Sequence, residues 1–310
     1  NIMFSRFASF IEVGGRTGLG YRDTAQDAMT IPHSNPEKCR QRIVELLRGL
    51  TTKGYGLHLF SPEWFDPDAK KEKKKPFKSP TVIPTVNAND LVYGLEDACS
   101  DDALWLLPSI IEYIKETGDA GFADETVTYA DGGEGTVYEH MKRILDFSAE
   151  QVGATGICKG LRADWNDCLR LGKQGESTFV AMQLYYAMSV LRIFAEQKND
   201  TEYIAYLDKI QKELGDIIQT KCWEDDRYIR GYKEDGMIIG SKHDPEANMW
   251  LNPQSWAVIS GLATKDQAEK ALESVHRELN TPYGVRLMAP SYVDHAFEGA
   301  LMLLFNPSTK

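Results

Sequence analysis

Apolar residues recur every three or four positions along most of this chain, which is the spacing of an amphipathic helix. The stretches with this spacing are a helix that begins after Asn35 and closes at Gly54 and Gly56, then 97–116, 136–152, 176–196, 200–220, 252–262 and 265–279. Runs with the strict alternation of a β-strand are few. The pattern therefore predicts a mostly helical protein and not a parallel α/β sheet.

In two of the predicted helices, the sequence also predicts the role or orientation of individual residues. Pro108 lies inside 97–116 and is expected to bend that helix. Asp97, Asp101 and Asp102 near its start are expected to interact favourably with the helix dipole. In 200–220, the residues predicted to face inward are Tyr203, Tyr206, Leu207, Ile210, Leu214 and Ile217.

Glycine and aspartate mark the turns between these helices. Asp131-Gly132-Gly133 predicts a turn before the helix at 136–152. The stretch 222–240 predicts a short hairpin that turns at Asp235-Gly236. We expect 281–290 to be a loop.

One glycine-rich segment combines a predicted loop with candidate chemistry. Its glycines are Gly153, Gly156, Gly160, Gly172 and Gly175. Between them lies Asp164-Trp165-Asn166-Asp167, in which an indole stands beside two carboxylates. An aromatic ring can cover the apolar face of a sugar while acids bind its hydroxyls, and a carboxyl beside an indole can stay protonated as a general acid. The alternative is structural: Asp164 caps a helix that starts near Trp165, and Trp165 belongs to the core.

A second candidate region is the bend from Gly14 to Gly20. It brings Arg16 and Arg22 close in sequence to Asp23 and Asp27. Guanidinium groups bind phosphate and sugar hydroxyls in fixed geometry. The alternative is a solvated turn with surface ion pairs, which are common and weak. The bend lacks the spacing of a nucleotide-binding glycine loop.

Charge and cysteine content narrow the class of protein. The 310 residues carry a formal net charge of -11, which argues against nucleic acid or an anionic membrane as partner but admits a small anion in a cationic pocket. No segment approaches the ~20 apolar residues of a membrane span, and 1–10 lack the pattern of a signal peptide. The five cysteines are scattered, which predicts free thiols in a cytoplasmic protein and no metal site.

Three motifs in order give this chain a specific resemblance. They are Asp164-Trp165-Asn166-Asp167, the stretch 20–27 (GYRDTAQD) and the stretch 251–258 (LNPQSWAV). Together they resemble the inverting disaccharide phosphorylases of glycoside hydrolase family 94, whose catalytic loop reads Asp-Trp-Asn-Asp. The resemblance spans nearly the whole chain.

The resemblance implies an all-α (α/α)6 barrel. We interpret 1–310 as part of that catalytic domain, cut at both ends and lacking the family's N-terminal β-sandwich, with 68–80 as a surface insertion. The family's remaining site residues, a Glu and a His, would lie beyond Lys310. The resemblance also implies a homodimer, no cofactor, and inorganic phosphate as co-substrate of a disaccharide.

The resemblance also implies residue roles. Asp167 matches the general acid, which protonates the bridging oxygen while phosphate attacks the anomeric carbon from the opposite face. Arg6, Arg22, Asp23 and Trp165 match residues that bind the donor sugar. In addition, Arg16 matches an arginine at the phosphate side, and Asp164 is expected to support the loop. Asp164 and Asp167 are too close in sequence to be an inverting acid and base, which stand roughly 6.5–9.5 Å apart.

Two other functions remain open. An inverting hydrolase of the same barrel would need a carboxylate base, for which Asp27, Asp101, Glu176 and Glu298 are candidates. A non-catalytic sugar-binding barrel would bind without turnover.

The disaccharide is open as well. The stretches 21–37 and 129–169 resemble the chitobiose phosphorylase branch, whereas 251–258 resembles the branches that use glucose. Because bulky Phe305 would disfavour an N-acetyl group at the donor site, we expect a β-linked glucosyl disaccharide, such as laminaribiose, cellobiose or cellobionic acid. The alternative is N,N'-diacetylchitobiose.

Overall fold

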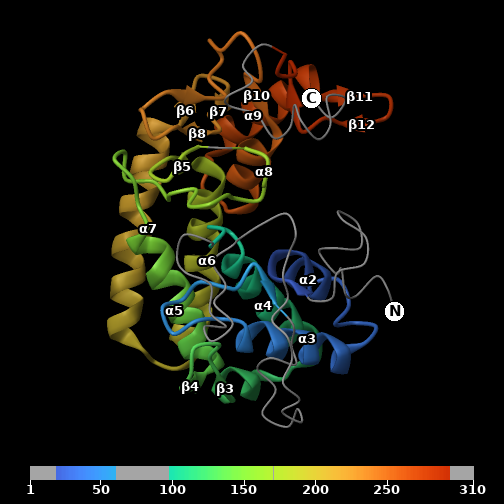
Figure 1. Ribbon diagram of the computed structural model, residues 1–310, viewed down its shortest axis with the longest axis vertical. Coiled ribbons are helices and arrows are strands. Elements are labelled where there is room, and N and C mark those ends of the chain that lie inside the picture. Colours follow the sequence, from blue (N-terminus) through green and yellow to red (C-terminus); the bar gives the residue numbers. More distant parts are fainter. Residues whose placement is uncertain (1–18, 61–97, 170, 294–310) are drawn as a thin grey trace, which may run out of the picture. The chain divides into compact units, whose positions relative to one another are not determined.

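The computed structural model describes residues 19–60, 98–169 and 171–293, and the chain divides into two compact units, 1–147 and 148–310 (Figure 1). The predicted insertion at 68–80 lies outside the described residues, as do Arg6, Arg16, Asp97, Glu298 and Phe305. Eight α-helices lie in the described ranges, which confirms the prediction of a mostly helical protein.

The first unit is built on three helices that pack against one another. They are α2 (Tyr21–Ala28), α3 (Pro36–Arg48) and α4 (Leu106–Thr117), preceded by the 3-10 turn η4 (Ala103–Trp105). Their shared core consists of fully buried apolar side chains, among them Tyr21, Ile43, Leu46, Leu107 and Ile110. The remaining elements are β1 (Leu19–Gly20) paired with β2 (Leu59–Phe60), η5 (Ala120–Asp124), β3 (Thr126–Thr128) paired with β4 (Glu134–Thr136), and α5 (Val137–Glu150).

Local signals explain where α3 begins. The Asn35 side chain accepts a hydrogen bond from the Lys38 N–H, and Pro36 occupies the first helical position, where its missing N–H costs nothing. The helix ends at Arg48, so the prediction that Gly54 and Gly56 close it is wrong. The chain has already turned by then, because Leu50 pairs with Gly56 in a β-bridge.

The helix predicted over 97–116 starts later than expected. Asp101 and Asp102 precede η4 and are fully buried, where they form ion pairs with other parts of the unit. Besides the dipole role expected for them, they therefore serve as partners of Arg22 and His58. Pro108 lies in the first turn of α4, where a missing N–H leaves no hydrogen bond unmade, and not in the middle of a longer helix.

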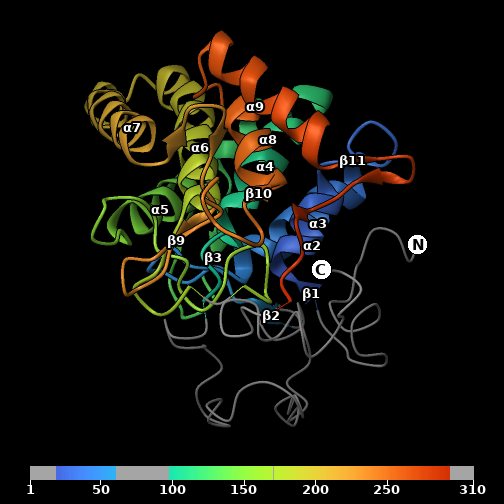
Figure 2. The same cartoon turned by 90° about the horizontal axis from the view of Figure 1, so that it is seen from above.

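The second unit is organised around α6 (Thr178–Gln197), which packs between α7 (Thr201–Lys221) and α8 (Leu251–Ile259) (Figures 1 and 2). The last helix, α9 (Lys265–Glu278), packs against α8. Side-chain caps start three of these helices: Ser177 for α6, Asp200 for α7, and a Thr264–Gln267 capping box for α9.

The inward stripe predicted for α7 is wrong in part. Leu207 and Leu214 are buried as predicted, but Tyr206 is exposed and the buried residue near the end is Ile218. Helix α6 also differs from expectation, since its length and apolar composition would suffice to cross a membrane. Because 72% of its most apolar window is buried, α6 fits the core helix of a folded unit. Absence of a membrane partner stays a prediction.

Short strands connect these helices. β6 (Trp223–Glu224) pairs with β7 (Arg227–Tyr228), and β8 (Gly231–Tyr232) pairs with both β5 (Glu176–Ser177) and β9 (Ile238–Ile239). The predicted turn at Asp235-Gly236 joins β8 to β9 and is confirmed. The prediction of a loop at 281–290 is wrong, because the segment contains β12 (Gly284–Val285), paired with β11 (Asn280–Thr281), and β13 (Met288–Ala289), paired with β10 (Met249–Trp250).

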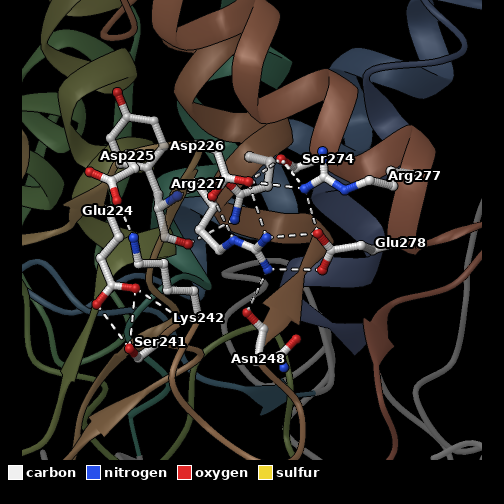
Figure 3. A network of polar contacts seen from close by, with 12 residues as sticks. Glu224, Asp225, Asp226, Arg227, Ser241, Lys242, Asn248, Ser274, Arg277 and Glu278 are labelled. Atoms are coloured by element: carbon white, nitrogen blue, oxygen red, sulfur yellow. Dashed lines mark hydrogen bonds and ion pairs between the residues drawn. The ribbon is translucent and has the colours of Figure 1, made fainter.

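An ion-pair network fastens the β6–β7 hairpin to α9 (Figure 3). Arg227 donates two hydrogen bonds to the Glu278 carboxylate, at 2.7 and 2.9 Å. Asp226 accepts from Arg227, Ser274 and Arg277. Burial alone would raise the pKa of Asp226, but these donors lower it to about 2.

Candidate functional site

The stretch that carries Asp164-Trp165-Asn166-Asp167 is a loop, as its glycines predict. Between α5 and β5 the described residues, 151–169 and 171–175, contain no helix, and two isolated bridges, Val152 with Cys158 and Lys159 with Glu176, hold the loop. No helix begins near Trp165, so the alternative in which Asp164 caps such a helix is wrong. Trp165 is only partly buried, which does not fit a core residue either.

Two consecutive side-chain turns shape the loop around Asp167. The Asp164 Oδ1 accepts a hydrogen bond from the Asn166 N–H at 2.9 Å, and the Asn166 Oδ1 accepts one from the Cys168 N–H at 3.1 Å. Asp164 and Asn166 are buried, whereas Trp165 and Asp167 are partly exposed. Two of the four motif residues therefore hold the backbone, while the indole and the second carboxyl remain accessible.

The far end of the loop is anchored by packing. Leu169 is buried in an apolar cluster of the second unit, together with Ile239 and Trp250, and Cys168 packs against it. Asp167 thus lies one residue before a stretch that the core holds in place.

Asp164 forms a buried two-point ion pair with Arg230. The distances are 2.7 Å from Arg230 Nη2 to Asp164 Oδ1 and 2.6 Å from Nη1 to Oδ2, and both side chains are almost completely buried. The Ser177 hydroxyl also donates to Asp164 Oδ2, at 2.6 Å. Burial would raise the pKa of Asp164, but Arg230 and these hydrogen bonds hold it below its ordinary value. Asp164 therefore stays ionised and is unsuited to donate a proton.

Sequence reasoning assigned no role to Arg230. It was part of the predicted hairpin, 66 residues beyond Asp164, and no local spacing links the two. The only feature of the sequence that could have indicated this role is that Arg230 directly precedes Gly231 in the predicted hairpin.

In the first unit, Arg22 is held by two acids. Its Nε and Nη2 donate to Asp101 Oδ2 and Oδ1 at 2.7 and 2.8 Å, and its Nε lies 3.6 Å from Asp102 Oδ1. The Trp105 indole N–H also donates to Asp101. Because Arg22 is buried, the alternative of a surface ion pair is wrong for this residue. Asp23, its neighbour in the first turn of α2, is partly exposed.

Beside this ion pair, three donor atoms are close enough to hold a metal ion. They belong to His58, Cys99 and Asp102 and lie within 4.8 Å of one another. Burial would lower the pKa of His58, but Cys99 and Asp102 raise it well above its ordinary value, which favours an imidazolium. That charge and the nearby Arg22 guanidinium both oppose a bound cation. Absence of a metal stays a prediction.

The candidate bases of a hydrolase are largely engaged. Asp101 binds Arg22 and Trp105, and the Glu176 Oε1 accepts from both the N–H and the hydroxyl of Thr155, at 2.9 and 2.7 Å. Asp27 is partly exposed on α2. Both Asp101 and Glu176 thus accept hydrogen bonds from other protein groups, which gives each of them a structural role.

The chain is similar in sequence to several known proteins. The sequence model described as "Glycosyl hydrolase 94 superfamily, catalytic domain" matches residues 1–310. The chain is 50% identical over 293 residues to an N,N'-diacetylchitobiose phosphorylase of Vibrio furnissii, covering 94% of this chain and 36% of that protein. It is 30% identical over 288 residues to a solabiose phosphorylase of Paenibacillus borealis, covering 92% of this chain and 34% of that protein. The chain thus spans about a third of the length of these relatives.

A solved structure is also similar. The fold resembles that of a rhamnosidase from Klebsiella oxytoca with rhamnose bound, with a TM-score of 0.54 at 15% identity over 85% of this chain and 42% of the rhamnosidase chain. At this identity the likeness concerns the fold alone.

Proposed function

Because this chain belongs to the glycosyl hydrolase 94 superfamily, we propose that the whole protein catalyses the inverting phosphorolysis of N,N'-diacetylchitobiose. The products are N-acetyl-α-glucosamine 1-phosphate and N-acetylglucosamine. The identity of 50% to a chitobiose phosphorylase, against 30% to a solabiose phosphorylase, supports this substrate. The glucosyl donor expected from the sequence depended on Phe305, which lies outside the described residues.

One observation carries the assignment of the acid. Within the loop, Asp164 is locked as a carboxylate by Arg230, while the side chain of Asp167 is partly exposed. In the proposed reaction Asp167 donates its proton to the glycosidic oxygen as the bond from that oxygen to the anomeric carbon breaks. A phosphate oxygen attacks the same carbon from the opposite face, and the proton that phosphate loses restores Asp167.

The other side chains have binding roles in this proposal. Trp165 packs against the donor sugar, and Arg22 and Asp23 bind its hydroxyls. The two-point contact with Asp101 holds Arg22 in one orientation, so little side-chain entropy is lost on binding. Arg6 and Arg16, outside the described residues, complete the donor site and hold the phosphate.

We also propose the (α/α)6 barrel, a homodimer, a cytoplasmic location, and phosphate as the only co-substrate, with no cofactor, nucleic acid or membrane. The helical content and the family membership support the barrel. The net charge of -11 supports the absence of nucleic acid and of anionic lipid as partners.

The test is a product assay on the whole protein that contains this chain. N,N'-Diacetylchitobiose is incubated with and without inorganic phosphate, and both products are quantified. We expect turnover only with phosphate, and Asp167→Asn should reduce kcat at least about 100-fold. The control Asp216→Asn makes the same chemical change on the exposed face of α7 and should keep full activity. Turnover without phosphate would instead indicate a hydrolase, and binding without turnover a sugar-binding protein.

A further inference from the structure

We infer that Arg230 is the positioning residue of the loop that carries Asp167. This inference rests on the proposed function, because it assigns Arg230 to the placement of the general acid. Arg230 lies between β7 and β8, its side chain is completely buried, and its guanidinium contacts Asp164 rather than the accessible part of the loop.

The guanidinium joins three elements at one point. Its two terminal nitrogens bind the two oxygens of Asp164, and Nη1 also donates to the Ser177 hydroxyl at 3.2 Å. The same hydroxyl oxygen caps α6 by accepting from the Val180 N–H. The loop is therefore tied to the hairpin and to the first turn of the central helix.

A short series of hydrogen bonds leads from this ion pair to the backbone of Asp167. The Asp164 Oδ1 that binds Arg230 also accepts from the Asn166 N–H, and the Asn166 Oδ1 accepts from the Cys168 N–H. The backbone N–H groups of both neighbours of Asp167 are thus held by side chains, that of Asn166 by Asp164 and that of Cys168 by Asn166. A rotation of Asp164 would move the acid.

Arg230 is itself rigidly placed. Its N–H donates to the Ile239 carbonyl at 2.7 Å, and its carbonyl accepts from the Thr178 N–H at 3.2 Å. Its guanidinium carbon lies 5.3 Å from the centre of the Trp250 ring. Only an arginine presents two parallel N–H groups to a carboxylate, so lysine would keep the charge and lose the orientation.

The competing explanation is that Arg230 only stabilises the fold. Substrates with different leaving groups distinguish this explanation from a role in placing the acid. A misplaced acid slows departure of a sugar, which must be protonated, but spares departure of 4-nitrophenolate, which needs no proton. If the substitution only destabilised the protein, kcat would fall by the same factor with both substrates.

The experiment compares Arg230→Lys with the matched control Arg227→Lys in the whole protein. Arg227 is also a buried arginine of this hairpin region, but its partners are Asp226 and Glu278 and not the loop. Initial rates are measured with inorganic phosphate and either N,N'-diacetylchitobiose or 4-nitrophenyl N-acetyl-β-glucosaminide, and Tm monitors folding.

For Arg230→Lys we expect kcat with the disaccharide to fall by about 100-fold, the typical cost of a misplacement of about 1 Å. KM should change less than about threefold, and kcat with the nitrophenyl substrate less than about fivefold, since binding and unassisted departure do not use the acid. Arg227→Lys should leave the ratio of the two kcat values unchanged.

Equal losses on both substrates, or an unchanged kcat with the disaccharide, would overturn the inference. If Arg230→Lys fails to fold, Ser177→Ala removes one hydrogen bond from Asp164 and should shift the same ratio in the same direction, and no shift would count against the inference. Failure of the proposed function is a separate result, because the unmodified protein would then show no phosphate-dependent turnover.

Discussion

Arg22 and Asp101 form a buried ion pair in the first unit, with both carboxylate oxygens accepting from the guanidinium at 2.7 and 2.8 Å. Asp101 therefore fixes the orientation of Arg22, which we propose to bind the donor sugar, before the substrate binds. The ion pair also explains why Asp101 serves as a partner of Arg22 and not as a candidate base.

Replacing this carboxylate should weaken binding. In Asp101→Asn, the buried guanidinium loses its counter-charge, and we expect KM for the disaccharide to rise about tenfold and the free energy of unfolding to fall by about 3 kcal/mol. Steady-state kinetics and urea denaturation measure the two effects. The control Glu112→Gln makes the same chemical change in an exposed pair on α4 and should alter neither quantity. An unchanged KM would show that the contact with Asp101 does not orient Arg22 for sugar binding.

The Asp226 network should make stability depend on pH in the acid range. The pKa of Asp226 is about 2 in the folded protein, against about 3.9 in an unfolded chain. A depressed pKa stabilises the fold fully above pH ~4 and less as the pH falls toward ~2, since the unfolded chain then binds a proton first. Asp226→Asn should therefore lower the free energy of unfolding at pH 6 and show a flatter decline between pH 5 and 3. Urea denaturation at each pH measures this, and parallel curves for the two proteins would contradict it.

Gly240 should tolerate no side chain, because it passes close to Arg230. Its φ is +79°, and a Cβ there would lie 2.8 Å from the Arg230 backbone nitrogen. We expect Gly240→Ala to destabilise the protein by at least about 2 kcal/mol, the sum of a left-handed backbone and a clash. Gly236→Ala is the matched control: its φ is +86° but nothing lies within 4 Å, so only the backbone cost of about 1 kcal/mol should appear. Equal costs in thermal or urea unfolding would show that the close approach has no effect.

The donor sugar can be tested in the reverse direction. With N-acetylglucosamine as acceptor, we expect synthesis from N-acetyl-α-glucosamine 1-phosphate to exceed synthesis from α-glucose 1-phosphate by at least about 100-fold. The reason is that a site built to bind the N-acetyl group leaves polar atoms unpaired when that group is absent. Phosphate release in each reaction measures the ratio. A preference for glucose 1-phosphate would restore the glucosyl donor expected from the sequence.

Local chemistry in the sequence determined most of the secondary structure. Helical spacing located α6, α7 and α9 to within a few residues, and Asn35 with Pro36 marked the start of α3, because caps and periodicity act between neighbours in the chain. The glycines around Asp164-Trp165-Asn166-Asp167 predicted a loop for the same reason.

Tertiary structure alone decided which charges meet. Arg22 pairs with Asp101, which lies 79 residues away in the sequence, and Arg230 pairs with Asp164, which lies 66 residues away. No rule based on sequence spacing predicts contacts at these separations. Once burial removes water, a carboxylate must be paired, so the fold made Asp101, an expected helix-dipole residue, the partner of Arg22. The same requirement turned Arg230, an unremarked hairpin residue, into the group that holds the motif loop.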